Sequence, residues 1–135
     1  MSRFEWPARV YWEDTDAGGV VFHANYLRYL ERARSEWLRS RGHVQPEIAQ
    51  RDGVLFSVVD LSIRYVKPAK LDDLLVVGCV VTRDGPASMR FHQQIHRGSG
   101  KGELVVEASV RVACVSADGY KPRRLPAAVL KDLEP

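Results

Sequence analysis

Residues 24–41 read ANYLRYLERARSEWLRSR, and apolar side chains recur in this stretch at the period of an α-helix. Spacings of four, three and four residues give one apolar stripe, made of Tyr26, Leu30, Ala33 and Trp37. The opposite face is charged and includes an i, i+4 pair of opposite sign, Arg32 and Glu36. Gly42 follows, where a helix commonly ends. The stretch therefore predicts one long amphipathic helix that buries its stripe.

Beyond this helix the sequence has the features of a sheet. We expect strands over residues 55–66, 74–82, 89–96 and 104–115, separated by turn residues. One face of the first strand is expected to carry Leu55, Val59, Leu61, Ile63 and Tyr65. The second strand is a nearly continuous run of Val, Leu and Cys, which is typical of a strand covered on both faces.

Before the helix, the apolar and aromatic residues of the stretch 9–13 predict a short strand, although Pro7 would keep its beginning out of a central ladder. A polar turn with two glycines follows at residues 14–19. One early helix followed by an antiparallel meander is an α+β layout, with the helix packed against a curved sheet. With 135 residues and no linker, we expect a single domain over residues 1–135.

The composition argues against several classes of protein. Lys and Arg number 20 against 17 Asp and Glu, and a net charge of +3 is small for a nucleic-acid binder. No stretch of the sequence approaches the roughly 18 consecutive apolar residues that a membrane-spanning helix needs, and no signal peptide is recognisable. Cys79 and Cys114 lack a Cys-x-x-Cys spacing and are interpreted as reduced, buried thiols of a cytoplasmic protein.

Three motifs superficially resemble phosphate-binding or metal-binding sites, but their spacing does not fit such a site. Residues 98–102 (GSGKG) lack the spacing of a phosphate-binding loop and are typical of a hairpin turn. His92 and His96 would stand roughly 13 Å apart along a strand, too far to share one ion. Asp14 and Asp16 have no further ligand nearby in the sequence. We therefore expect no metal and no cofactor.

The turn at residues 14–19 and the helix start after it could form a catalytic site. Gly18 and Gly19 allow the backbone to approach a ligand closely beside Asp16. The first amides of the helix, near His23, lack partners within the helix and can stabilise an oxyanion. The alternative is that Asp14 and Asp16 only form the turn or cap the helix.

Several blocks of the chain carry a resemblance to a known family. These are residues 14–26 (DTDAGGVVFHANY), 56–61, 64–69, 71–73 and 121–126. The first block resembles the signature of the 4-hydroxybenzoyl-CoA thioesterase family of hotdog-fold proteins, and more specifically its YbgC branch, which is associated with the Tol–Pal system. The resemblance covers almost the whole chain.

The resemblance implies a hotdog fold, in which one long helix is wrapped by five or six antiparallel strands. It implies pairing of two subunits edge to edge, as a dimer or a dimer of dimers (a homotetramer), and hydrolysis of an acyl-CoA to a free acid and CoA. The catalytic carboxylate falls on Asp16, as nucleophile or general base, and the oxyanion-binding N–H falls on His23. Relatives specialised for the aromatic substrate have tyrosine at position 23, so the histidine argues against that specialisation.

Further substrate-binding candidates accompany this assignment. Around the helix start they are Gly18, Gly19, Phe22, Asn25 and Tyr26, and on the strand they are Val58 and Val59. Basic candidates for the CoA phosphates are Arg64, Lys67, Lys70, Arg123 and Arg124, with Lys121 beside the last two. Core packing is the favoured role for Tyr26, Asn25 could be a cap or a pocket residue, and the basic clusters could be solvated strand ends.

A second function stays open at this point. The chain could be a non-enzymatic module that binds an acyl thioester or docks acyl carrier protein, whose acidic surface would meet the basic clusters. A hotdog dehydratase is a more distant alternative.

Overall fold

The structure, a computed structural model, describes residues 3–133. Its five antiparallel strands form one sheet in the order β1-β3-β4-β5-β2. The strands are β1 (Phe4–Arg9), β2 (Val54–Tyr65), β3 (Leu74–Arg83), β4 (Ser88–Arg97) and β5 (Leu104–Ser116). The α-helices are α1 (Tyr26–Ser40), α2 (Gln45–Asp52) and α3 (Ala127–Leu133), and two 3₁₀-helices are η1 (Trp12–Asp14) and η2 (His23–Asn25).

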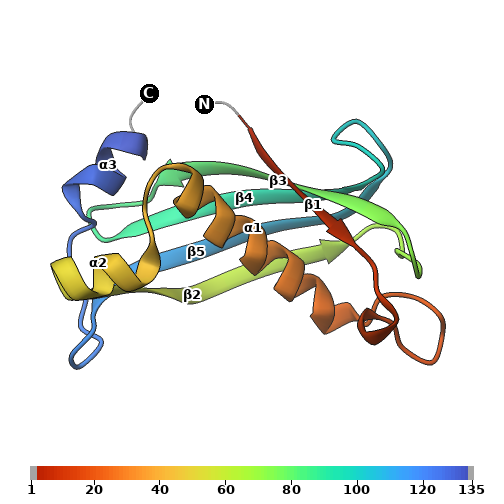
Figure 1. Ribbon diagram of the computed structural model, residues 1–135, viewed down its shortest axis with the longest axis horizontal. Helices are drawn as coiled ribbons and strands as arrows, with labels where there is room; N and C mark the ends of the chain where they lie inside the picture. Colours follow the sequence, from red (N-terminus) through yellow and green to blue (C-terminus); the bar gives the residue numbers. More distant parts are fainter. Residues whose placement is uncertain (1–2, 134–135) are drawn as a thin grey trace.

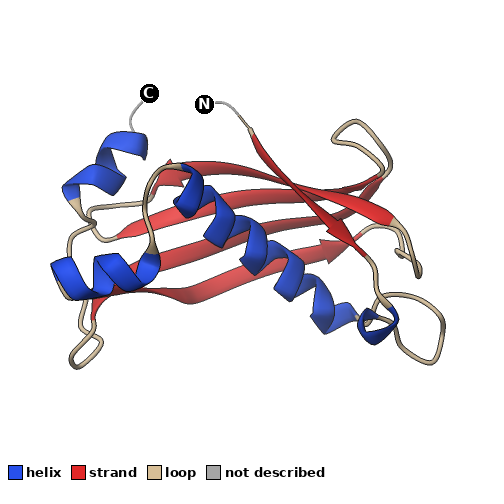
Figure 2. Ribbon diagram, in the orientation of Figure 1, coloured by secondary structure: helices blue, strands red, loops and turns tan. Residues whose placement is uncertain are grey.

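Helix α1 crosses one face of the curved sheet diagonally (Figure 1). Figure 2 shows α2 and α3 at one end of the sheet and the loop that contains η1 and η2 at the other end. The predicted α+β layout of one long helix on an antiparallel sheet is confirmed. No helix within residues 3–133 is long and apolar enough to cross a membrane.

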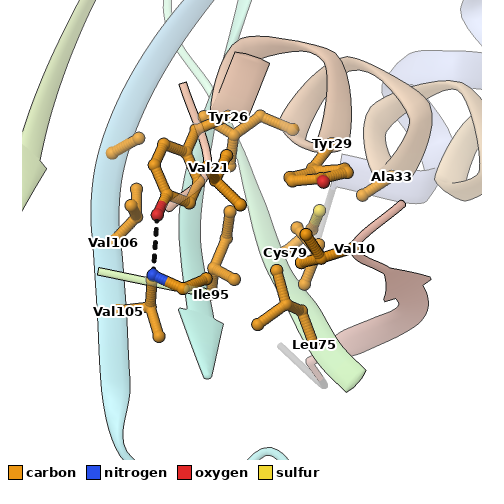
Figure 3. Close-up of a cluster of buried hydrophobic side chains, with 14 residues drawn as sticks. Val10, Val21, Tyr26, Tyr29, Ala33, Leu75, Cys79, Ile95, Val105 and Val106 are labelled. Atoms are coloured by element: carbon orange, nitrogen blue, oxygen red, sulfur yellow. Dashed lines mark hydrogen bonds between the residues drawn. The ribbon is translucent and has the colours of Figure 1, made fainter. Parts of the chain in front are cut away.

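The apolar stripe of α1 forms the core, as its spacing predicts. All four stripe residues are at most 3% exposed. In Figure 3, Tyr26 and Tyr29 of α1 pack over side chains of the sheet such as Leu75 and Cys79. A second cluster joins Trp37 of α1 to Ile48 of α2, Phe91 of β4 and Val129 of α3, among other residues. Each large side chain contributes about 1.5–3 kcal/mol by burial, so this face fixes the helix on the sheet.

The prediction of a strand at residues 9–13 is wrong. The strand is β1, which contains Pro7, and residues Trp12–Asp14 form η1 instead. Among the described residues, β1 pairs with β3 alone, at the edge of the sheet. An edge strand tolerates proline because one side of its backbone has no ladder to complete.

Helices α2 and α3 depart from the prediction of sheet alone beyond the long helix. α2 begins with Pro46 in its first turn and ends at Gly53, whose φ of 68° is left-handed. Only Ile48 of α2 is buried, and only Val129 and Leu133 of α3. One or two buried residues in a short helix give no readable period, which is why the pattern does not reveal them.

Strand β2 contains a β-bulge that changes which side chains face α1. Val58 pairs with Val112 and Asp60 pairs with Arg111, so Val59 is the extra residue. Paired residues share a face, and Val112 belongs to the core under α1. The α1 side of β2 therefore carries Phe56, Val58, Leu61, Ile63 and Tyr65. The expectation that Leu55 and Val59 share this face is wrong.

Strand β3 is covered less completely on its outer face than its apolar sequence predicts. The side chains of β3 that face α1 are fully buried, whereas Val76 and Val80 on the outer face are half-buried, so the second face is only partly covered. Cys79 and Cys114 are buried free thiols, as expected. Burial raises the pKa of Cys79 to about 11, which keeps this thiol protonated. Residues 98–102 form the turn between β4 and β5, as expected.

Candidate active site

Asp16 lies in a tight turn between η1 and η2. Its carboxylate Oδ1 accepts a hydrogen bond of 2.8 Å from the Gly18 N–H, and its carbonyl accepts one of 3.0 Å from the Gly19 N–H. Gly19 has a φ of 81°, which glycine adopts without strain. Asp16 is exposed, and no hydrogen bond within residues 3–133 uses its Oδ2. The residue therefore forms the turn with one oxygen and presents the other to solvent.

The rest of this loop is held against the segment that follows β2. Val21 donates its N–H to the Ala69 carbonyl at 2.9 Å, and Val20 forms an isolated bridge with Lys70. Thr15 forms a second bridge with Val21. The turn is thus a small ordered element.

Asp14 anchors the loop from inside. It is only 5% exposed. Its Oδ2 accepts the Tyr11 N–H at 2.8 Å, its Oδ1 accepts the side-chain amide of Asn25 at 2.9 Å, and its carbonyl accepts the Phe22 N–H at 2.9 Å. Burial alone would raise the pKa of Asp14, but these hydrogen bonds to the carboxylate outweigh it and hold the pKa below its ordinary value. Asp14 and Asn25 therefore fix the loop at both of its ends.

The start of η2 presents free backbone donors. Within residues 3–133 no acceptor faces the N–H groups of His23 and Ala24, the first two residues of η2. The Phe22 carbonyl accepts the Asn25 N–H at 2.8 Å, and the His23 carbonyl accepts the Tyr65 hydroxyl at 2.9 Å. Two donors therefore stand seven and eight positions after Asp16, at the other end of one anchored loop.

A cleft of about 270 Å³ opens beside His23, the first of these two residues. It is lined by Val21, His23, Tyr26, Tyr65, Val66, Lys67 and Pro68. Tyr26 is 3% exposed, and its hydroxyl accepts the Ala69 N–H at 3.0 Å, the dashed line in Figure 3. Tyr26 therefore packs in the core and forms the floor of the cleft, and burial raises its pKa.

The structure brings together only part of the predicted site. His23, Tyr26 and Lys67 line the cleft, and the exposed Phe22 ring lies 4.6 Å from the His23 ring between centroids. Asp16, Gly18 and Gly19 form the turn outside the cleft lining, and Asn25 is turned inward to Asp14.

Other predicted residues lie elsewhere. Arg64 points to the outer face of the sheet, where it pairs with Glu107 at 2.7 Å. Lys70 follows Lys67 and is exposed beside the turn. Val58 lines an apolar groove between α1 and β2, and Val59 is the exposed bulge residue. Arg123 and Arg124 are exposed in the segment between β5 and α3. In Figure 1 this segment lies at the end of the sheet that carries α2 and α3, opposite the start of α1.

A larger cleft of about 550 Å³ lies on the outer face of the sheet. Its arginines are already engaged, since Arg3 contacts Gln94 and His96 and Arg64 pairs with Glu107. None of residues 11–30 lines it. Within residues 3–133, no group of three or more His, Cys, Asp or Glu side chains could hold a metal ion. The smaller cleft beside His23 is therefore the better candidate.

Sequence reasoning did not assign a role at the site to Tyr65. Its place at the end of an apolar alternation marks the face that it occupies, but not its hydrogen bond to a residue 42 positions away. The pattern predicts no more for Asp14 than a place in the turn or a helix cap, whereas the structure shows it buried, with each carboxylate oxygen accepting a hydrogen bond.

The sequence signature of this loop and sheet matches a known family. A model of the thioesterase superfamily matches residues 18–111, which include the helix-start donors, the cleft, strands β2, β3 and β4, and the first part of β5. The chain belongs to the thioesterase superfamily.

Relatives of this thioesterase extend the match to nearly its full length. The acyl-CoA thioester hydrolase YbgC of Escherichia coli O6:H1 is 40% identical over 131 residues, covering 97% of this chain and 96% of the relative. The acyl-CoA thioesterase YbgC of Haemophilus influenzae is 43% identical over 126 residues, covering 93% and 90%. The resemblance to YbgC-like thioesterases is thereby confirmed, and with it the prediction of an enzyme.

A solved structure confirms the fold. A 4-hydroxybenzoyl-CoA thioesterase variant, crystallised with 4-hydroxybenzoyl-CoA, has a TM-score of 0.87 at 20% identity, covering 98% of this chain and 99% of that chain. The predicted hotdog fold of this thioesterase is therefore correct.

Proposed function

We propose that this protein hydrolyses acyl-CoA thioesters to a free acid and CoA. The relatives named above, which it matches over nearly their whole length, are described as acyl-CoA thioester hydrolases. The observation that carries the proposal is the anchored loop, which has an exposed carboxylate at Asp16 and two free amides at His23 and Ala24.

Two routes fit the carboxylate. In the first, Asp16 Oδ2 attacks the thioester carbonyl, the C–S bond breaks, and water then hydrolyses the mixed anhydride. In the second, Asp16 removes a proton from the water that attacks the carbonyl. In both, the His23 and Ala24 amides donate to the oxyanion, and the thiolate of CoA leaves and takes up a proton. The His23 imidazole, exposed in the cleft, either supplies this proton or orients the water.

The substrate site is proposed to be completed by a second subunit. β2 is an edge strand, and Val58, Val59, Leu61 and Tyr65 on it are 40–49% exposed. Such an edge is a template for pairing with another chain. In an antiparallel β2–β2 pair, the start of one β2 lies beside the end of the other. The end of β5 pairs with the start of β2 in the same subunit, and Arg123 and Arg124 follow this end of β5. In the dimer these two arginines would therefore approach Lys67 of the other subunit.

This arrangement gives the basic residues a common role. Lys67 and Lys70 from one subunit and the cluster at residues 121–124 from the other would bind the phosphates of CoA, while the acyl group enters the cleft. Arg64, on the outer face, is the least suited of the basic candidates. The cytoplasmic location and the Tol–Pal association implied by the resemblance stay predictions.

A thiol-release assay tests the proposal. Wild type, Asp16→Ala and Asp16→Asn are assayed on a panel of short, long and aromatic acyl-CoAs, with the exposed neighbour substitution Glu13→Gln as the control. We expect wild type and Glu13→Gln to release thiol and both Asp16 variants to lose at least about a hundredfold in kcat. Full activity of Asp16→Ala would remove the catalytic assignment. No thiol release from any substrate, together with salt-sensitive binding of acyl carrier protein, would favour the binding module instead.

A further inference from the structure

Tyr65 is the last residue of β2, and its side chain is hydrogen-bonded to the start of η2. Its hydroxyl donates a hydrogen bond of 2.9 Å to the carbonyl oxygen of His23. Its ring lies 5.7 Å from the ring of Tyr26 and 6.3 Å, edge on, from the imidazole of His23, between centroids. These contacts hold the phenol in one place although the residue is 46% exposed.

The bonded carbonyl belongs to the same planar peptide group as the Ala24 N–H. A donor on the oxygen of a peptide group fixes the direction of its N–H and polarises it, which makes the N–H a stronger donor. The peptide group before it, Phe22–His23, is held within η2 by the bond from Asn25 to the Phe22 carbonyl. The two free amides are therefore oriented differently, one by the local turn and one by a side chain from β2.

We propose that Tyr65 is a positioning residue for catalysis, which aims and polarises the Ala24 N–H toward the thioester oxyanion. This inference rests on the proposed thioesterase function. It assigns a catalytic consequence to a hydroxyl that lies outside the loop and that needs no contact with the substrate. The gain appears where negative charge develops, so it acts on kcat and leaves KM largely unchanged.

Tyr65→Phe removes only this hydroxyl, and Tyr120→Phe is the matched control. Tyr120 is 71% exposed, lies after β5 and does not line the cleft of its own subunit. Loss of a whole oxyanion donor lowers kcat about 10²–10³-fold, so weakening one is expected to lower kcat about tenfold in Tyr65→Phe. We expect its KM to stay within about twofold of wild type and Tyr120→Phe to match wild type in both constants.

The second measurement does not depend on turnover. In ¹H–¹⁵N spectra, the Ala24 amide proton is expected to move upfield in Tyr65→Phe and to stay in place in Tyr120→Phe. An unmoved Ala24 amide would overturn the proposal, as would an unchanged kcat, and a raised KM with unchanged kcat would mean that the hydroxyl contacts the substrate instead. If wild type releases no thiol from any acyl-CoA, the proposed function fails and the role of Tyr65 fails with it, whereas active wild type beside unaffected Tyr65→Phe overturns the role of Tyr65 alone.

Discussion

At the scale of single residues, the order of the candidate site depends on Asp14. Replacing Asp14 by Ala leaves the buried Asn25 side-chain amide and the half-buried Tyr11 N–H without their acceptor. Each unsatisfied group costs about 1–3 kcal/mol, so we expect Asp14→Ala to lower the free energy of unfolding by about 2 kcal/mol or more. Urea unfolding measures this against Glu13→Ala, an exposed neighbour expected to change it by less than about 0.5 kcal/mol. Equal stability of the two variants would show that the network contributes little.

The same carboxylate predicts a dependence of stability on pH. Its pKa in the folded protein lies below the ordinary value of 3.8, because the hydrogen bonds it accepts favour the charged form. The ionised group therefore stabilises the fold at pH above about 4, and this contribution is lost as the pH falls through the lowered pKa. The urea midpoints of wild type and Asp14→Asn should therefore converge as the pH is lowered from about 5 to about 2. A constant difference over this range would assign the effect to packing.

Sequence alone predicts the site residues unevenly at this scale. Asp16, Gly18, Gly19 and His23 fall in one contiguous motif, so a local pattern can identify them. Tyr65 reaches His23 across 42 positions, and only the folded register of β2 brings the two together. A contact of that kind leaves no trace in the spacing of residues.

At the scale of elements, α2 depends on a single buried side chain. Ile48 is 2% exposed and belongs to the cluster that contains Trp37. Ile48→Ala creates a cavity there and is expected to cost about 2–5 kcal/mol, measured by urea unfolding. Gln50→Ala, on the exposed side of α2, is the control and is expected to be nearly neutral. A neutral Ile48→Ala would mean that α2 is held by its flanking residues instead.

Long elements are predictable and short or irregular ones are not. α1 and the four long strands are predictable because each keeps a periodic pattern or an apolar run over many residues. α2 and α3 bury too few residues to show a period. The bulge of β2 is hidden because Val58 and Val59 are both apolar and β-branched, so the sequence does not show which of them leaves the core face.

At the scale of the whole molecule, the proposed edge-to-edge dimer gives a prediction about assembly. Leu61→Lys places a charge among the exposed apolar side chains of β2, and it is expected to convert a dimer or tetramer to a monomer. Light scattering coupled to size exclusion measures the mass. Leu71→Lys, on a residue that is 52% exposed outside the strands, is the control and should leave the mass unchanged. A wild-type monomer would contradict the proposed site shared between subunits.

The distribution of charge gives a second prediction at this scale. The net charge of the chain is only +3, yet the basic side chains at residues 121–124 and at Lys67 and Lys70 gather at two places on it. If these places bind CoA phosphates, raising the salt concentration screens them and increases KM with little effect on kcat. Steady-state kinetics at several salt concentrations measure this, with Arg123→Ala expected to show a weaker dependence. A KM that does not respond to salt would show that both clusters are solvated surface charges that do not bind the CoA phosphates.

The extra residue in β2 has a consequence for how this chain can vary through evolution. Before Val59, even-numbered residues of β2 face α1, and after it odd-numbered residues do. The half of the strand near α2 and the half that ends in Tyr65 can therefore change their residues independently. The side chain at position 59 is 49% exposed in the single subunit, so replacing it leaves the core of that subunit unchanged. Its deletion is a different event, because it would turn one half of the strand over and exchange core and solvent faces. Homologues should therefore conserve the length of the strand more strictly than the identity of this residue.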